Sequence, residues 1–371
     1  MAGNFVQLHN HTHYSLLDGA SKVPDLVKRV KELGMPAVGI TDHGNMHGAY
    51  ELWRAAVDSG VKPIIGIEAY VTPETARQDK TRVSWDTNWT PVPGHARNPD
   101  DVSGGGLITP LTMWAENDEG LVNLIKASSV ANLEGRVMRY PRMDKEVLST
   151  YSKGVIASSG CPSGIIQTRL RLGQFDEALR AAGEFQDIFG KDNFYIELMD
   201  HGLSIESKVT GDLLTIAKKL GAPLLATNDS HYVMEADKDA QDAMLCINSG
   251  ATLDDPNRFK FEGSGYYIKS AEEMRELFKD HPDACDNTLE IAERCNVIFD
   301  DHEDGAFMPQ FDCPEGWDET SLFLKKVEEG LEKRYDGNPP MEVLKQADYE
   351  CGVICQMQFC GYFLVVADYI N

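Results

Sequence analysis

Up to about residue 230, short apolar runs alternate along the chain with longer segments in which apolar residues recur at helical spacing. The apolar runs predict seven strands, at residues 5–8, 37–40, 63–71, 107–115, 154–157, 193–199 and 223–227. Segments with a helical period follow most of them, at residues 21–33, 50–59, 120–131, 163–172, 175–189 and 205–220. This alternation is typical of parallel strands joined by crossover helices and therefore predicts an α/β fold.

Polar residues stand directly after many of the predicted strands, for example residues 41–44 after the second strand and 228–231 after the last. In a closed barrel the ends of all parallel strands meet on one face, where catalytic loops collect. In an open sheet only the strands beside one crevice would contribute. The recurrence of polar clusters after successive strands thus favours a TIM-like barrel over a doubly wound open sheet.

Two stretches interrupt the alternation. Residues 72–106 are rich in proline, glycine and polar residues, which predicts an irregular loop. We expect Trp85 and Trp89 to pack this loop onto the body, although they could instead stack a base. From about residue 235 only helical patterns remain, at 235–248, 271–279, 284–295, 321–335 and 341–360, with an extended linker at 307–317. Residues 362–371 form an apolar tail, so we expect the chain to stop inside a longer protein.

The chain has 371 residues and a formal net charge of −24, which opposes a surface that coats nucleic acid. The charge is compatible with a metal site for phosphates, because bound cations meet the anion there. No apolar run is long enough to span a bilayer and no basic-then-apolar signal opens the chain, so we predict a cytoplasmic protein without a membrane segment. The glycine-rich phosphate loop, the G-x-S-x-G elbow and the G-x-G-x-x-G fingerprint are also missing from the sequence. None of the eight cysteines forms a C-x-x-C pair, and we expect most of them to be reduced core thiols.

His9 and His11 stand at the end of the first predicted strand. Alternate residues of a strand point to the same side, so the two imidazoles would project together and offer one metal ion two ligands. Asp229 and His231 repeat this spacing after the last predicted strand. The candidate metal ligands from all the strand ends are His9, His11, Asp18, His43, Glu68, Cys161, Asp229 and His231. Further candidates near the sixth strand are Glu197, Asp200 and His201.

Imidazoles and carboxylates that converge with one thiolate suit two or three divalent metal ions, with zinc favoured and manganese, iron or magnesium as alternatives. A site with two metal ions suits the hydrolysis of phosphoesters. Each candidate also has an ordinary structural interpretation, since His43 could be a turn histidine and Cys161 an inert buried thiol. Glu68 lies among apolar residues, where an unpaired carboxylate is costly, so we expect a cationic partner for it. Asp42 is expected to orient His43.

Five segments of the chain, residues 9–19, 41–44, 66–70, 159–161 and 227–232, resemble the PHP (polymerase and histidinol phosphatase) domain. Residues 197–202 and 361–366 are similar to the branch of this family that opens the bacterial DNA polymerase III alpha subunit, and residues 100–104 to its actinobacterial form. The resemblance implies a distorted (β/α)7 barrel over residues 1–285. It also implies that residues 286–371 are the helical start of a polymerase portion and stop before its catalytic palm.

The resemblance implies a site for up to three metal ions. It puts His9, His11, Glu68 and Asp229 on the first ion, Glu68 and Cys161 on the second, and Asp18, His43 and His231 on the third. On this basis we expect Glu68, Asp229 and His43 to be catalytic in a 3′→5′ exonuclease that proofreads DNA 3′ ends. The implied partners are DNA and other replisome subunits, including the sliding clamp and a separate proofreading subunit.

In one place the sequence departs from the family pattern, which has a histidine just before Leu-Thr-Met where this chain has Pro110. Proline has no ligand atom, so the second metal ion would keep only Glu68 and Cys161 from the protein unless water or His95 substitutes. We therefore expect metal binding at two positions at least, with an exonuclease weakened by Pro110. Two other functions stay open: a free-standing phosphoesterase for a small phosphate monoester, and a non-catalytic scaffold braced by metal ions.

Overall fold

The chain folds into two compact units, Met1–Phe299 and Asp300–Asn371. In this computed structural model, residues 5–92, 97–299 and 310–370 are described. The predicted division between residues 285 and 286 falls inside helix α11 (Pro282–Arg294), whose Ile291 and Ala292 pack in the core of the first unit. The two units therefore divide later in the chain than the sequence suggested.

A seven-stranded sheet forms the centre of the first unit, in the order β1-β2-β3-β5-β6-β7 with β4 beside β2. The strands are β1 (Ala37–Ile40), β2 (Lys62–Val71), β3 (Thr109–Ala115), β4 (Arg142–Met143), β5 (Val155–Ser158), β6 (Phe194–Leu198) and β7 (Leu224–Ala226). The segment predicted as the first strand makes an isolated bridge instead, from Gln7 to Val38 of β1, and Asn10 just after it makes another to Ser230 beyond β7. These bridges tie the start of the chain to both ends of the strand order, and the predicted α/β, barrel-like fold is confirmed.

One strand runs against the predicted direction. β3 is antiparallel to β2 and β5, whereas the other strand pairs are parallel. The described part of the connection between β2 and β3 contains only the short α3 (Ser103–Gly106) and no crossover helix, so the chain returns from the end at which β2 stops. The prediction of parallel strands throughout was therefore wrong for β3, whose first residues lie beside Tyr70 and Val71.

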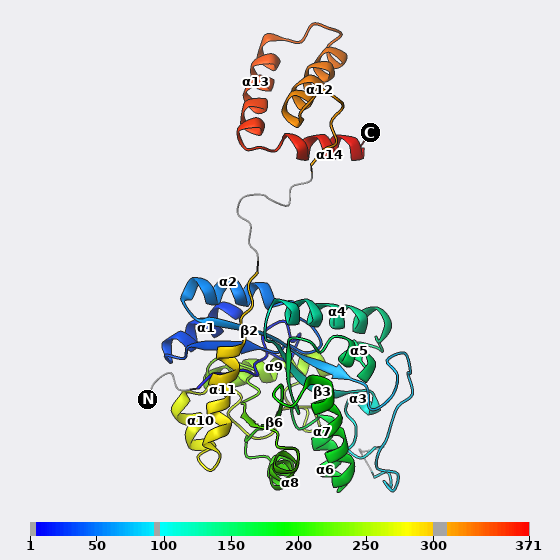
Figure 1. Ribbon diagram of the computed structural model, residues 1–371, viewed down its shortest axis with the longest axis vertical. Helices are drawn as coiled ribbons and strands as arrows, with labels where there is room; N and C mark the ends of the chain where they lie inside the picture. Colours follow the sequence, from blue (N-terminus) through cyan, green and yellow to red (C-terminus); the bar gives the residue numbers. More distant parts are fainter. Residues whose placement is uncertain (1–4, 93–96, 300–309, 371) are drawn as a thin grey trace. The chain divides into compact units, whose positions relative to one another are not determined.

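Helices surround the sheet of the first unit (Figure 1). They are α1 (Val23–Glu32), α2 (Ala49–Ser59), α4 (Asp118–Glu134), α5 (Lys145–Thr150), α6 (Ile165–Arg171), α7 (Phe175–Phe189), α8 (Ser204–Leu220), α9 (Lys238–Ser249), α10 (Ala271–Leu277) and α11, with a 3-10 turn, η1 (Glu235–Asp237), before α9. The helical spacing of apolar residues in the sequence predicted all of these helices except α5. Its physical basis is visible in α1, which buries Val23, Leu26 and Val30 along one face.

The inner face of the sheet changes from apolar to polar along its length. Its apolar layer takes residues from the first segment, most strands and α11: Val6, Leu8, Ala37, Ile64, Trp114, Ile156, Tyr195, Leu225, Ile291, Ala292 and Cys295. Side chains on one face of a strand are two residues apart. Ser158, Glu197 and Thr227 therefore follow Ile156, Tyr195 and Leu225 on the same face. The apolar layer fills one end of the barrel, and polar side chains collect at the other.

Two arginines hold the long connection between β2 and β3 against the body. Arg142 of β4 is fully buried, and its guanidinium donates to four backbone carbonyls, those of Arg77, Asp79, Leu107 and Gly135. The guanidinium of Arg169 lies 3.7 Å over the ring of Trp85, which packs against the main core. Trp85 thus packs the loop onto the body, as expected from the sequence.

The described residues of the second unit form α12 (Glu319–Arg334), α13 (Met341–Gln356) and α14 (Cys360–Ile370), drawn in orange and red in Figure 1. Leu322, Phe323, Cys360 and Leu364 make its small core. The apolar tail forms α14, which the sequence did not predict as a separate helix. No single helix of the described chain is long and apolar enough to cross a membrane. Only α13 and α14 taken together have sufficient length and apolar composition, and the chain bends by 113° between them.

Candidate metal centre

His9 and His11 point into one cluster at the polar end of the barrel. Their Nε2 atoms lie 3.3 Å apart. The Oδ1 atom of Asp229 lies 3.4 Å from Nε2 of His9 and 3.0 Å from Nε2 of His11. The backbone bends at His9, so strand alternation alone does not explain this convergence. Reciprocal backbone hydrogen bonds with Ser230 hold the histidine segment beside Asp229.

Glu68 of β2 lies between two groups of imidazoles. Its Oε1 atom is 3.8 Å from Nε2 of His9, and its Oε2 atom is 3.8 Å from Nε2 of His11. On the other side, Oε2 of Glu68 is 2.5 Å from Nδ1 of His43. A backbone bridge between residues 43 and 68 sets this approach. The two oxygens of Glu68 thus face imidazoles of both groups.

Asp18, His43 and His231 form the second group. Oδ2 of Asp18 lies 2.8 Å from Nε2 of His43 and 3.8 Å from Nε2 of His231. The ring of His11 lies between these histidines, with centroid distances of 4.0 Å to His43 and 4.3 Å to His231. The two groups therefore form one continuous cluster.

The loop that carries Asp18 depends on a close backbone approach. A Cβ atom on Gly19 would lie 2.2 Å from the carbonyl oxygen of Thr12, so only glycine lets the loop fold back here. Leu17, the residue before Asp18, has a φ angle of 61°, and Asp229 across the cluster has one of 44°. Both lie in the left-handed region that non-glycine residues rarely adopt. Such backbone conformations persist where the surrounding structure fixes them, as at functional sites.

Several carboxylate oxygens of the cluster lie beside imidazole nitrogens but form no well-aligned hydrogen bond. Among the described residues, both oxygens of Glu68 and the Oδ1 atoms of Asp18 and Asp229 are buried and accept no hydrogen bond of acceptable geometry. Buried carboxylates without donors are costly unless a cation compensates them. Imidazole nitrogens and carboxylate oxygens are ligands that zinc, manganese and iron accept. The residues present thus fit divalent metal ions.

The protonation states also suit metal binding. Burial opposes a charge on His9, but Glu197 and Asp229 outweigh it and raise its pKa to about 9. Burial, together with nearby His43 and His231, lowers the pKa of His11 to about 3. Burial favours the neutral forms of Glu68 and Asp229, yet the surrounding imidazoles hold the pKa of both carboxylates below the usual range. These pKa directions favour the charged carboxylates and the neutral form of His11, the forms that bind metal ions, whereas a metal ion would displace a proton from His9 and from His43, whose pKa is also raised.

Glu197 lies behind His9. Its Oε1 atom is 2.7 Å from Nδ1 of His9, while the hydroxyls of Ser158 and Thr227 donate to its two oxygens. A carboxylate in this position fixes the orientation of the ring and directs Nε2 into the cluster. The sequence singled out Glu197 as a further candidate ligand, but it contacts the ligand candidate His9 from outside. Ser158 and Thr227 were missed, although their places two residues after Ile156 and Leu225 are a usable signal.

The other candidates near β6 do not join the cluster. Nδ1 of His201 lies 2.7 Å from Oε1 of Glu206, and its Nε2 lies 2.9 Å from the carbonyl oxygen of Asn228. Asp200 is exposed and accepts from the backbone N–H of Gly202. These residues brace the loop after β6.

Glu197→Gln is expected to lower metal affinity roughly tenfold, because outer partners of metal-binding histidines are typically worth about 10–100-fold in affinity. The amide keeps the size of the side chain but removes the charge that faces His9. Chelator competition measures the change. Glu206→Gln is the matched control, since Glu206 is also buried and paired with a histidine, yet lies outside the cluster. Equal loss in both variants would contradict the role of Glu197.

Asp42 organises the loop that contains the first histidines. Its carboxylate accepts from the backbone N–H and hydroxyl of Thr12 and from the hydroxyl of Ser15. The Ser15 hydroxyl in turn lies 2.9 Å from Nδ1 of His11 and accepts from the backbone N–H of His43. Asp42 was expected to orient His43, and it reaches both His43 and His11 through the hydroxyl of Ser15, a residue for which the sequence predicted no role.

Pro110 stands at the rim of the cluster. It opposes Tyr70 at the start of β3. Thr112, two residues on, reaches His9 with its hydroxyl at 3.4 Å from Nδ1, so Pro110 is on the same face of the strand. An imidazole at residue 110 would therefore face the cluster. His95, the suggested substitute, lies outside the described residues.

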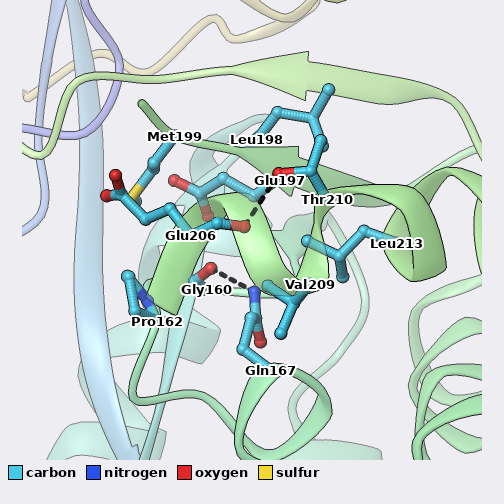
Figure 2. Close-up of a pocket in the computed structure, with 10 residues that line it drawn as sticks. All are labelled: Gly160, Pro162, Gln167, Glu197, Leu198, Met199, Glu206, Val209, Thr210 and Leu213. Atoms are coloured by element: carbon cyan, nitrogen blue, oxygen red, sulfur yellow. Dashed lines mark hydrogen bonds between the residues drawn. The ribbon is translucent and has the colours of Figure 1, made fainter. Parts of the chain in front are cut away.

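The thiol of Cys161 faces the cluster from the turn after β5. Burial and the charges of Glu68 and Asp229 raise its pKa, so a bound cation is needed to make it a thiolate. Figure 2 shows how the turn is held: the side chain of Gln167 donates to the carbonyl of Gly160 at 2.7 Å. The cavity in this view, behind Glu197, measures only about 20 Å³, which suits one water molecule and no substrate.

Two segments of the chain match known protein families. Residues 7–201, more than half of the chain, match the PHP domain, and residues 321–371 match the "Bacterial DNA polymerase III alpha NTPase domain". The chain belongs to the PHP domain family. Asp229 and His231 lie beyond the matched part of this PHP domain, yet its backbone brings them to His9 and His11 through Ser230.

Relatives of this PHP chain include DNA polymerase III subunit alpha of Mycobacterium leprae (strain TN), 50% identical over 369 residues. The match covers 99% of this chain and 31% of that protein. The subunit of Saccharopolyspora erythraea is 49% identical over 98% of this chain and 30% of its own length. The chain thus spans about a third of the relatives it matches. A solved amidohydrolase from Chromobacterium violaceum covers 61% of this chain and 87% of its own, at 15% identity and a TM-score of 0.36, too low to support an argument.

Proposed function

We propose that the cluster binds two or three divalent metal ions and hydrolyses phosphodiester bonds. One observation carries the proposal: buried carboxylate oxygens of Asp18, Glu68 and Asp229, which form no well-aligned hydrogen bond in the described chain, converge on four imidazoles. Zinc is the favoured ion, with manganese, iron and magnesium as alternatives, because the ligand set mixes nitrogen and oxygen with one thiol.

The proposed ligands fall into groups that follow the geometry. His9, His11, Glu68 and Asp229 would hold one ion, and Asp18, His43 and His231 another; Glu68 with Cys161 would hold a third. Metal ions in such sites activate water and neutralise the phosphate. Glu68, Asp229 and His43 are the residues we propose as catalytic. Glu68 would serve both groups, and Asp229 and His43 would hold ions that bind the phosphate and activate water.

We propose DNA 3′ ends as the substrate and proofreading as the role. The support is the naming of the relatives as DNA polymerase III subunit alpha, together with the match of residues 321–371 to a domain of that subunit. The whole protein would then be a cytoplasmic replicative polymerase. Its partners would be DNA and replisome subunits, among them a sliding clamp and a separate proofreading subunit.

A second function has one observation in its favour. Pro110 offers no ligand on a face of β3 that points at the cluster, so the group of Glu68 and Cys161 gains no further ligand from this position. The alternative is a scaffold in which metal ions brace the barrel without catalysis.

The test is 3′→5′ digestion of a mismatched primer by metal-loaded wild-type chain and by Pro110→His. We expect slow digestion by wild type and digestion at least about tenfold faster by the variant. A change in even an outer partner of a metal ligand typically alters metal affinity or activity about 10–100-fold. The double variant with Asp229→Ala should be inactive. If none of the proteins digests DNA while bound metal is found, the scaffold is the correct function. If wild type hydrolyses only a small phosphate monoester, the domain is a general phosphoesterase.

A further inference from the structure

A cavity of about 530 Å³ opens beside α9, outside the metal cluster. Lys238 and Gln241 of α9 line it, together with Arg258, Lys260 and Phe261 from the segment that follows. Sites for small ligands and cofactors commonly measure about 300–1,000 Å³. The cavity is therefore large enough for a nucleotide and larger than a bare phosphate needs.

The cavity adjoins the group of Asp18, His43 and His231. The rings of Phe261 and His231 form a T-shaped pair, with the centroids 4.6 Å apart. The amide of Gln241 donates to the carbonyl oxygen of Asp18 at 3.1 Å. Two lining residues thus contact two of the proposed metal ligands, and a ligand in the cavity would lie next to the cluster.

The charge of the cavity wall is opposite to that of the chain. Lys238, Arg258 and Lys260 face Asp242 and Glu262, so three cations meet two carboxylates in a protein whose formal charge is −24. Arg258 is held by Asp242 through two hydrogen bonds of 2.6 Å. Lys238 and Lys260 are exposed and form no salt bridge within the described residues. Two cations thus remain available for an anionic ligand.

We infer that this cavity binds a nucleotide of single-stranded nucleic acid next to the phosphate held at the cluster. Lys238 and Lys260 would contact backbone phosphates, and the exposed part of the Phe261 ring would stack a base. A cationic groove with aromatic side chains is the usual composition of surfaces that bind single strands without sequence preference. The inference rests on the proposed function and adds the position of its substrate.

Binding to a short, 5′-fluorescein-labelled oligothymidylate tests the inference. Phosphorothioate linkages slow its cleavage, and fluorescence anisotropy reports affinity at several salt concentrations. For the double variant Lys238→Ala/Lys260→Ala we expect affinity to fall about tenfold at low salt. The slope of log affinity against log salt should shrink by about 1.4, because each phosphate contact with a single strand contributes ~0.7.

The matched control is Lys80→Ala/Lys126→Ala, which removes two exposed lysines outside the cavity and leaves the same net charge. We expect this control to bind like wild type. No binding by wild type, equal affinity of wild type and the cavity variant, or equal loss in both double variants would overturn the inference.

Hydrolysis of bis-(p-nitrophenyl) phosphate, measured in parallel, separates the two claims. This small diester does not need the cavity, so the cavity variant should hydrolyse it at the wild-type rate. If wild type does not hydrolyse the diester but the cavity variant alone loses oligonucleotide affinity, the proposed hydrolysis fails and the nucleotide subsite stands.

Discussion

Asp229→Ala is expected to lower the rate of metal-dependent phosphodiester hydrolysis more than about 100-fold. The loss of even an outer partner of a metal ligand typically lowers metal affinity or activity about 10–100-fold. The Oδ1 atom of Asp229 lies within 3.4 Å of both His9 and His11, at the centre of the first proposed ligand group. Alanine leaves two imidazoles without the carboxylate that completes their group. Initial rates with bis-(p-nitrophenyl) phosphate, together with elemental analysis of bound metal, measure the effect.

Asp200→Ala is the control for this experiment. Asp200 is an aspartate of the same end of the barrel, but it is exposed and caps the N–H of Gly202 outside the cluster. Rate and metal content should stay at the wild-type level. A similar loss in both variants, or full activity of Asp229→Ala, would contradict the assignment of Asp229.

Arg142→Met is expected to reduce the free energy of unfolding of the first unit by about 3–5 kcal/mol, since each buried acceptor left without a partner costs about 1–3 kcal/mol and relaxation recovers part of it. The guanidinium of Arg142 is fully buried and binds four backbone carbonyls from three separate segments. Methionine fills similar space but donates no hydrogen bond. Urea unfolding followed by circular dichroism measures the difference.

Arg136→Met provides the comparison for Arg142. Arg136 is exposed, and its guanidinium makes one long hydrogen bond of 3.5 Å to the carbonyl of Met138. Its loss should change stability by no more than about 0.5 kcal/mol, as is usual for surface substitutions. Equal destabilisation by the two substitutions would show that the buried carbonyl contacts of Arg142 contribute little.

Periodicity predicted much of the fold but not strand direction. The helices α1, α7 and α8 lie within two residues of their predicted bounds, because each has an apolar stripe at helical spacing. The direction of β3 was missed because an antiparallel and a parallel strand have the same alternation of side chains. The two-residue β4 and the six-residue α5 are too short to have a period.

Residue types and their positions after predicted strands were enough to predict which side chains gather in the cluster. Strand alternation suggested that His9 and His11 converge, and they do, but through a bend at His9 that no periodicity encodes. The position of Glu197 behind His9 depends on a contact between segments 188 residues apart in the chain. Such a contact follows from the curling of the sheet, which brings the first segment beside the strands at the far end of the order, so it could not be predicted from local sequence.

The central claim is that the cluster holds metal ions in two or more adjacent groups. Anomalous scattering at the zinc edge from crystals grown with zinc tests it most directly. We predict one peak among His9, His11, Glu68 and Asp229, and a second among Asp18, His43 and His231. Crystals in which neither group shows a peak, at zinc concentrations that saturate the protein in solution, would contradict the account.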